Sequence, residues 1–117
     1  MIRVFTYGTL RRGLSNHDLI DGRYSKVKES QVKGFKKITK GCLPYAITAP
    51  DSILDGELYE FETDEILSDL DLLEGYNLPG YDYNHYDRIT IQDINGLEAY
   101  MYVMSETSPT QENENSC

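Results

Sequence analysis

The sequence predicts an α+β domain whose strands curl into a small barrel. Three observations support this prediction: most predicted elements are strands, residues 63–75 form one convincing helix, and Asn95-Gly96 separates two strand-like runs. With 117 residues the chain has room for a single modest core. We expect one domain over residues 1–104 and a disordered acidic tail over 105–117, because the tail contains no aliphatic residue.

Strand-like runs dominate the predicted order of elements. A short helix is expected within 13–22, with Ser15 as its cap and Asp18 at the capping-box position. The strand at 52–61 is expected to bend or bulge at Gly56. The remaining strand-like ranges are 2–6, 27–38 and a hairpin at 88–104, with a proline-interrupted extended segment at 42–50.

Charge and composition exclude several classes of protein. The net charge of −9 argues against general binding to nucleic acid or to an anionic membrane. All the lysines fall between Lys26 and Lys40, and we interpret them as a solvated strand face, because the run lacks aromatic residues arranged for base stacking.

No apolar run approaches the ~20 residues of a membrane span, and the N-terminus lacks a signal peptide, so a cytoplasmic location is expected. Cys42 and Cys117 give neither a disulfide framework nor a zinc spacing, and we predict no metal and no cofactor.

The turn after the first strand, "FTYGTLRRG" at 5–13, is rich in free backbone amides. Gly8 and Gly13 have the spacing of a phosphate loop, but Leu14 and Ser15 follow where such a loop has lysine and then serine or threonine. Amides at 8–11 would bind a carboxylate or an oxyanion as well as a phosphate. On spacing alone, a plain connection from strand to helix explains the glycines more simply.

The helix at 63–75 places a carboxylate on its apolar side. Its apolar stripe is Ile66, Leu67, Leu70 and Leu73, and Glu74 continues that stripe while Leu72 lies off it. The negative end of the helix dipole, the nearby charge of Asp71 and partial burial all predict a raised pKa for Glu74. A carboxyl of this kind is a candidate general acid and base. Pairing of Glu74 with Arg88, or exposure to water, explains the pattern equally well.

Several motifs together resemble the gamma-glutamylcyclotransferase-like family. They are "YGTL" at 7–10, "ILDGELYEF" at 53–61, "LDLLEGY" at 70–76 and "YDR" at 86–88, in the order and spacing of that family. The YGTL form and the short chain are closest to the gamma-glutamylamine cyclotransferase branch. The resemblance covers residues 2–104 and implies a small mixed β-barrel with flanking short helices.

The resemblance also implies a reaction and its residues. The α-amino group of a gamma-glutamyl substrate attacks its own side-chain amide, which yields 5-oxoproline and a free amine. Glu74 would be the catalytic acid and base, and Arg88 would support the site structurally. The residues implied to hold or border the substrate are Tyr7, Gly8, Thr9, Leu10 and Tyr102. We expect a small-molecule gamma-glutamyl substrate, a monomer or homodimer, and no nucleic acid or membrane partner. The alternative is a non-catalytic ligand-binding or regulatory module on the same fold.

Overall fold

The computed structural model describes residues 1–8, 17–40, 43–74 and 86–104. The predicted tail at 105–117 and the Ser15 cap lie outside these residues. No helix in the described ranges is long and apolar enough to cross a membrane. In chain order the elements are β1 (Ile2–Thr6), the 3-10 helix η1 (His17–Leu19), β2 (Lys26–Lys40), β3 (Leu43–Phe61), α1 (Ile66–Glu74), β4 (Tyr86–Gln92) and β5 (Glu98–Met104).

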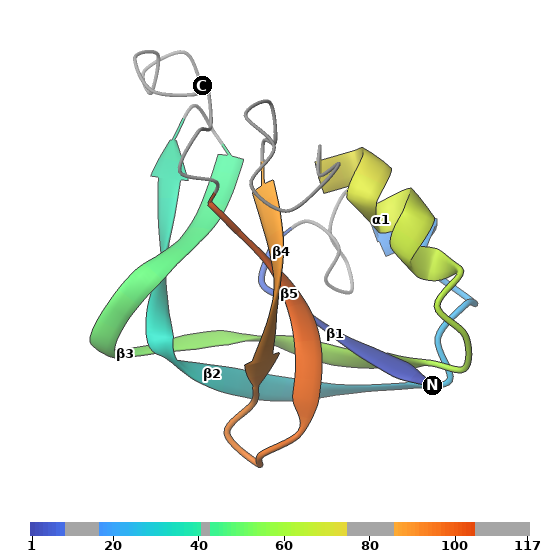
Figure 1. The fold of residues 1–117 in the computed structure, drawn as a ribbon, viewed down its shortest axis with the longest axis horizontal. Coiled ribbons are helices and arrows are strands. Elements are labelled where there is room, and N and C mark those ends of the chain that lie inside the picture. The colour runs from blue at the N-terminus through green and yellow to red at the C-terminus, as the bar shows by residue number, and fades with distance from the viewer. Residues whose placement is uncertain (9–16, 41–42, 75–85, 105–117) are drawn as a thin grey trace.

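The strands form one mixed sheet in the order β2-β3-β1-β5-β4 (Figure 1). β1 pairs with β5 in parallel, and the other neighbouring strands are antiparallel. Within the described residues β2 and β4 are the edges of this sheet, so the predicted barrel is not confirmed. The sheet is nevertheless strongly curled, because the Ile94 N–H, at the tip of the β4–β5 hairpin, donates to the Gln31 carbonyl of β2 at 2.8 Å.

The extended segment predicted at 42–50 and the strand predicted at 52–61 are one continuous strand, β3. Figure 1 shows β2 and β3 bending together, so that their two arms stand at a steep angle. The register shifts between Lys33 and Phe35, around Gly34, which has a φ of 89°. Of the bend or bulge predicted at Gly56, the bulge is wrong, since the ladder passes Gly56 without a shift. Gly56 is needed for close packing instead, because a Cβ there would lie 2.2 Å from the Thr6 carbonyl oxygen of β1.

The predicted helix is confirmed, but it begins later than expected. α1 starts at Ile66, and a tighter turn precedes it, in which the Leu67 N–H donates to the Asp64 carbonyl at 3.0 Å. The predicted cap, Thr63, accepts only a long 3.5 Å contact from the Glu65 N–H. Leu72 is 83% exposed, as its position off the apolar stripe predicts. The shorter helix expected near 13–22 is a three-residue 3-10 turn in the described part.

The hairpin predicted at Asn95-Gly96 is confirmed, with a loop of three residues. The Gly96 N–H donates to the Asp93 carbonyl, and Gly96 has a φ of 83°, as a type I turn followed by a left-handed residue requires. The Asp93 carboxylate accepts from the N–H groups of Asn95 and Leu97, both at 2.9 Å. The Ser30 hydroxyl of β2 donates to the same carboxylate at 2.8 Å, so this turn also fixes the curl of the sheet.

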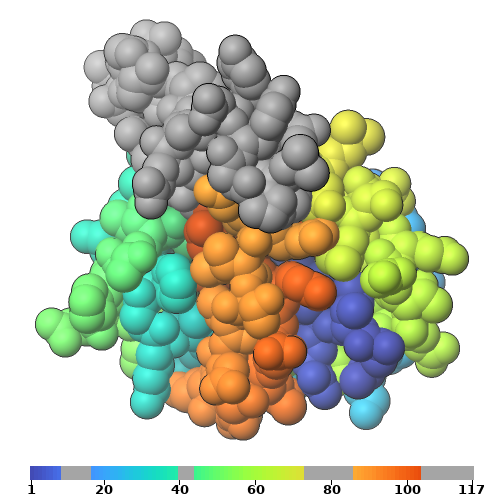
Figure 2. Space-filling view, in the orientation of Figure 1, coloured from blue at the N-terminus to red at the C-terminus, as the bar shows by residue number. Residues whose placement is uncertain are grey.

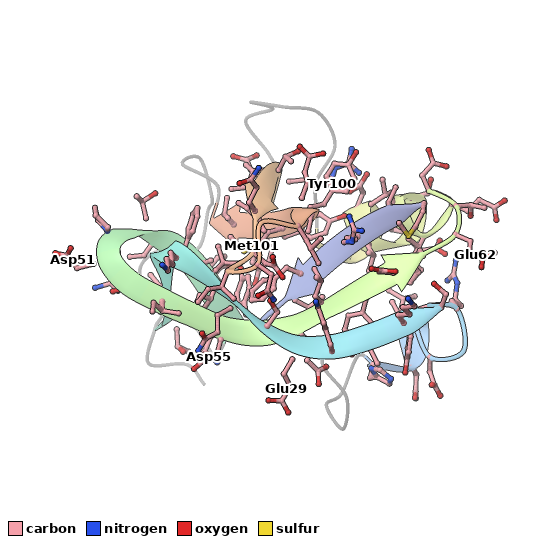
Figure 3. All side chains as sticks on the ribbon, turned by 90° about the horizontal axis from the view of Figure 1, so that it is seen from below. Glu29, Asp51, Asp55, Glu62, Tyr100 and Met101 are labelled. Carbon is pink, nitrogen blue, oxygen red and sulfur yellow. The ribbon has the colours of Figure 1, made fainter. Side chains whose placement is uncertain are left out.

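Buried side chains lie on both faces of the sheet. One core cluster includes Val4 of β1 with Ile66 and Leu70 of α1. The other lies inside the curl and includes Phe5 of β1 and Met101 of β5, which sits between β5 and the β2–β3 layer (Figure 3). On the face shown in Figure 2, β4 lies between the β2–β3 arm on one side and α1 on the other. β1 is the central strand of the sheet, and its C-terminal end continues through the buried Tyr7 to Gly8.

The lysine-rich stretch is an edge strand. Lys26, Lys28, Lys33 and Lys37 are all exposed along β2. Lysines on an edge discourage other chains from adding to the sheet. This placement agrees with the interpretation of the stretch as a solvated strand face.

Candidate functional site

Tyr7 fixes the beginning of the glycine-containing turn. Its side chain is buried, and its hydroxyl donates to the Tyr102 carbonyl of β5 at 2.5 Å. The same hydroxyl accepts from the Ala46 N–H of β3 at 3.0 Å. The residue directly before Gly8 is thus tied to two different strands.

Two tyrosine hydroxyls form hydrogen bonds with the backbone of β3 along an edge that no described strand covers. β1 pairs only with the C-terminal end of β3, from Glu57 onward, so the backbone near Pro44 faces away from any ladder on that side. Ala46 uses its N–H there to bind Tyr7, and the Pro44 carbonyl accepts from the Tyr86 hydroxyl at 2.6 Å. Pro44 is tolerated in the strand because its missing N–H lies on this uncovered side.

Gly8 packs tightly against β3. A Cβ at Gly8 would lie 3.1 Å from the Cγ atom of Pro44, which is closer than ordinary van der Waals contact. A side chain at this position would push the turn away from the strand. Gly8 therefore keeps the backbone of the turn close to the sheet, whatever the turn binds.

The other half of the site is the C-terminal end of α1. Asp71 accepts from Arg88 Nη1 at 3.0 Å and 2.9 Å through its two carboxylate oxygens, and from the Tyr102 hydroxyl at 2.6 Å. Arg88 and Tyr102 are directly opposite each other on β4 and β5, so both side chains leave the same face of the sheet. The Arg88 guanidinium also lies over the Tyr100 ring, 5.1 Å from its centroid.

Burial has a clear electrostatic effect at Tyr102. Desolvation raises the pKa of the Tyr102 hydroxyl far above its ordinary value, and the hydrogen bond to Asp71 and the charge of Asp71 add to the rise. Arg88 opposes the rise only in part. The phenol therefore stays protonated and acts as a hydrogen-bond donor to Asp71.

Tyr102 joins the two halves of the site. Its side chain binds Asp71, one turn before the end of α1, and its carbonyl accepts from Tyr7, directly before Gly8. Of the predicted site residues, Tyr7, Arg88 and Tyr102 are thus brought together. Glu74 is the last residue of α1, and its side chain lies outside the described part, as do Thr9 and Leu10. Their predicted roles, and those of the other site residues, stay predictions.

The role of Asp71 was missed in the sequence. The sequence predicts that the Asp71 charge raises the pKa of Glu74, whereas in the structure Arg88 balances that charge. The signal was available, because Arg88 is the sole lysine or arginine after residue 50 and Asp71 lies in the same helix as Glu74. The expected rise in the pKa of Glu74 therefore depends on burial and on the helix dipole.

A second buried polar cluster was also missed. Glu57 is 9% exposed, and its carboxylate accepts from the Tyr59 hydroxyl at 2.6 Å. His17 Nδ1 lies 3.4 Å from the same hydroxyl. Thr6 pairs directly with Glu57, and its buried hydroxyl oxygen has no hydrogen-bond partner among the residues that the structure describes. Thr6 lies in β1, Glu57 and Tyr59 lie in β3, and His17 lies in η1, so the cluster forms only when these three elements pack together.

Known proteins are similar to this chain in sequence. The family model "Gamma-glutamyl cyclotransferase, AIG2-like" matches residues 4–116. A gamma-L-glutamyl-butirosin B gamma-glutamyl cyclotransferase from Niallia circulans is 33% identical over 92 residues, which cover 79% of this chain and 58% of that protein. A putative gamma-glutamylcyclotransferase from Drosophila melanogaster is 29% identical over 112 residues, covering 87% of this chain and 69% of the other.

Solved structures show the same fold. An uncharacterised protein from Pyrococcus horikoshii matches with a TM-score of 0.68 and 21% identity, covering 99% of this chain and 88% of its own. An AIG2-like protein from mouse matches with a TM-score of 0.64 and 21% identity, covering 97% and 86%. The family match extends over nearly all of the sequence, and the chain belongs to the gamma-glutamyl cyclotransferase, AIG2-like family.

Proposed function

We propose that this protein is a gamma-glutamyl cyclotransferase that releases 5-oxoproline and a free amine from a gamma-glutamyl amine or amino acid. Family membership and the names of the two relatives support the proposal. The observation that carries it is the double contact of Tyr102, which connects Tyr7 in the YGTL motif with Asp71 in the LDLLEGY motif. The two motifs are far apart in sequence and meet at one residue.

The proposed reaction requires little catalytic machinery. The substrate's α-amino nitrogen forms a bond to its own side-chain carbonyl carbon, and the amide bond to the leaving amine then breaks. Because nucleophile and electrophile belong to one molecule, good positioning alone can contribute about 7–11 kcal/mol. The protein must then hold the glutamyl group, accept one proton and return it to the leaving amine.

We assign the proton transfers to Glu74. The α-ammonium group, with a pKa near ~8, must lose a proton before it attacks, whereas an ordinary glutamate has a pKa of ~4.3. This mismatch corresponds to roughly 5 kcal/mol at ~1.36 kcal/mol per unit. A position at the C-terminal end of α1 disfavours the ionised form of Glu74 and so reduces the mismatch. The same protonated carboxyl then donates its proton to the leaving amine.

We assign the glutamyl group to the turn that begins at Tyr7 and Gly8 and continues through Thr9 and Leu10. The Tyr7 hydroxyl is already bound to Tyr102 and Ala46, so the contribution of Tyr7 comes from its backbone. Backbone amides in this turn would bind the substrate's α-carboxylate or stabilise the oxyanion on the side-chain carbonyl. The close packing of Gly8 against Pro44 supports this assignment, because it fixes the position beside β3 at which the turn begins.

The test is 5-oxoproline release from a panel of gamma-glutamyl compounds, glutathione included, by the wild type and by Glu74→Gln. We expect release by the wild type and a loss of about 10²–10⁴-fold in kcat in the variant. Glu65→Gln is the matched control, since Glu65 is an exposed glutamate directly before α1, and it should leave kcat unchanged. Release that survives Glu74→Gln would refute the role of Glu74. Binding of a panel member without turnover would favour a non-catalytic binding module.

A further inference from the structure

The Asp71 carboxylate accepts hydrogen bonds from two side chains, Arg88 of β4 and Tyr102 of β5. We propose that Asp71 is a positioning residue, which sets the last turn of α1, and with it Glu74, against the turn that begins at Gly8. This inference rests on the proposed function, because it concerns the placement of the proposed acid and base. It goes beyond that function in assigning a role to a residue that touches no reacting atom.

The contacts of Asp71 hold the helix from two strands at once. Both of its oxygens accept from Arg88 Nη1, at 3.0 Å and 2.9 Å, and one also accepts from the Tyr102 hydroxyl at 2.6 Å. Arg88 and Tyr102 are a cross-strand pair, so their backbones are fixed relative to each other by the β4–β5 ladder. A carboxylate held in this way by two donors of a rigid hairpin has little freedom to move along or around the helix axis.

The position of Asp71 in the helix matters as much as its contacts. Glu74 follows three residues later, so the two side chains leave neighbouring positions one turn apart. The described part of α1 has no basic residue in its last turn to stabilise the helix end. Leu70 is buried in the core one turn before the helix end, and the Asp71 contacts add a polar anchor next to it. Displacement of that turn would move Glu74 away from the reacting atoms.

The same contacts extend to the other half of the site. Tyr102 donates its hydroxyl to Asp71 and offers its carbonyl to the Tyr7 hydroxyl, at 2.6 Å and 2.5 Å. One residue of β5 thus carries a continuous chain of hydrogen bonds from the end of α1 to the start of the glycine turn. These bonds connect the helix turn that contains Asp71 with Tyr7, the residue directly before Gly8.

The molecule offers a matched control in the same helix. Asp69 also ties α1 to another part of the chain, since Arg23 Nη1 lies 2.9 Å from its Oδ2 atom. The Asp69 pair is much more exposed, with side-chain exposures of 48% and 40% against 24% and 23% for Asp71 and Arg88. Exposed pairs contribute little to structure. Asp69 also lies farther from Glu74 along the helix.

The experiment compares 5-oxoproline release by the wild type, Asp71→Asn and Asp69→Asn, under conditions in which circular dichroism shows each protein folded. Asn keeps the shape of Asp but removes the charge that binds Arg88. Since a misplacement of about 1 Å can cost about 10²-fold in rate, we expect kcat of Asp71→Asn to fall about 10–100-fold with KM changed less than about threefold. Asp69→Asn should match the wild type. Asp71→Glu, which keeps the charge, should recover part of the lost kcat.

The outcomes separate this inference from the proposed function. An active wild type with Asp71→Asn as active as Asp69→Asn would overturn the positioning role and leave the cyclotransferase proposal intact. A wild type inactive on every compound would overturn both. If Asp71→Asn does not fold, Tyr102→Phe replaces it, since it removes one donor to Asp71 and keeps Arg88 in place. A kcat of Tyr102→Phe equal to that of the wild type would then overturn the inference.

Discussion

The two hydrogen bonds of the Tyr7 hydroxyl predict how much the free energy of unfolding falls when this hydroxyl is removed. Replacing Tyr7 with phenylalanine keeps the buried ring but leaves the Ala46 N–H and the Tyr102 carbonyl without this partner. Both residues are buried, with exposures of 1% and 4%, so neither group reaches bulk water easily. Each buried group left unsatisfied costs about 1–3 kcal/mol, which predicts a loss of about 2–6 kcal/mol in the free energy of unfolding.

The assay is equilibrium unfolding in urea. With a slope of roughly 1.5 kcal/mol/M for a domain of this size, a loss of 3 kcal/mol lowers the unfolding midpoint by about 2 M. Tyr86→Phe removes the hydrogen bond from the Tyr86 hydroxyl to the Pro44 carbonyl and should also lower the midpoint. Tyr100→Phe is the control, because the Tyr100 hydroxyl forms no hydrogen bond with the described residues. A Tyr7→Phe midpoint equal to that of Tyr100→Phe would refute the reasoning.

Two further predictions concern the fold around the site. Asp93→Ala should lower stability by about 1–3 kcal/mol, because the carboxylate accepts two backbone N–H groups and the Ser30 hydroxyl. Burial acts to raise the pKa of Asp93, but these hydrogen bonds and the charge of Lys28 hold it below its ordinary value of 3.8. The stabilisation is therefore present above about pH 4 and is lost as pH falls through the lowered pKa, so urea midpoints of wild type and variant should converge in acid. Gly56→Ala should prevent folding or cost more than about 3 kcal/mol by thermal unfolding, because its Cβ would lie 2.2 Å from a backbone oxygen; a midpoint near that of the wild type would contradict this packing.

Local signals in the sequence predicted individual helices and strands. The features that the sequence did not predict depend on contacts between residues far apart in the chain. The hairpin follows from Asn95-Gly96, and α1 follows from its apolar stripe, since both depend on neighbouring residues alone. The union of two predicted segments into β3 could not be predicted, because Pro44 and Pro50 usually end strands. β3 tolerates Pro44 because no described strand pairs with that side of β3 near Pro44. This gap depends on how the strands assemble into the sheet, so the residues around Pro44 do not reveal it.

The candidate site also combines local motifs, which the sequence shows, with long-range contacts, which it does not. The YGTL and LDLLEGY motifs located its two halves, but nothing in either motif names the residue that joins them. Tyr102 was expected only to border the site, whereas it binds both halves. The pairing of Asp71 with Arg88 depends on the docking of α1 against β4, so no pattern within the helix reveals that a cation balances the Asp71 charge.

The central claim is that the substrate's own amine attacks, so that water takes no part in the reaction. The most direct test is turnover of the best gamma-glutamyl compound in water enriched in oxygen-18, followed by mass spectrometry of the product. Cyclisation predicts unlabelled 5-oxoproline from the wild type, with little product from Glu74→Gln. Glutamate carrying one oxygen-18 atom would show hydrolysis by water and would contradict the account.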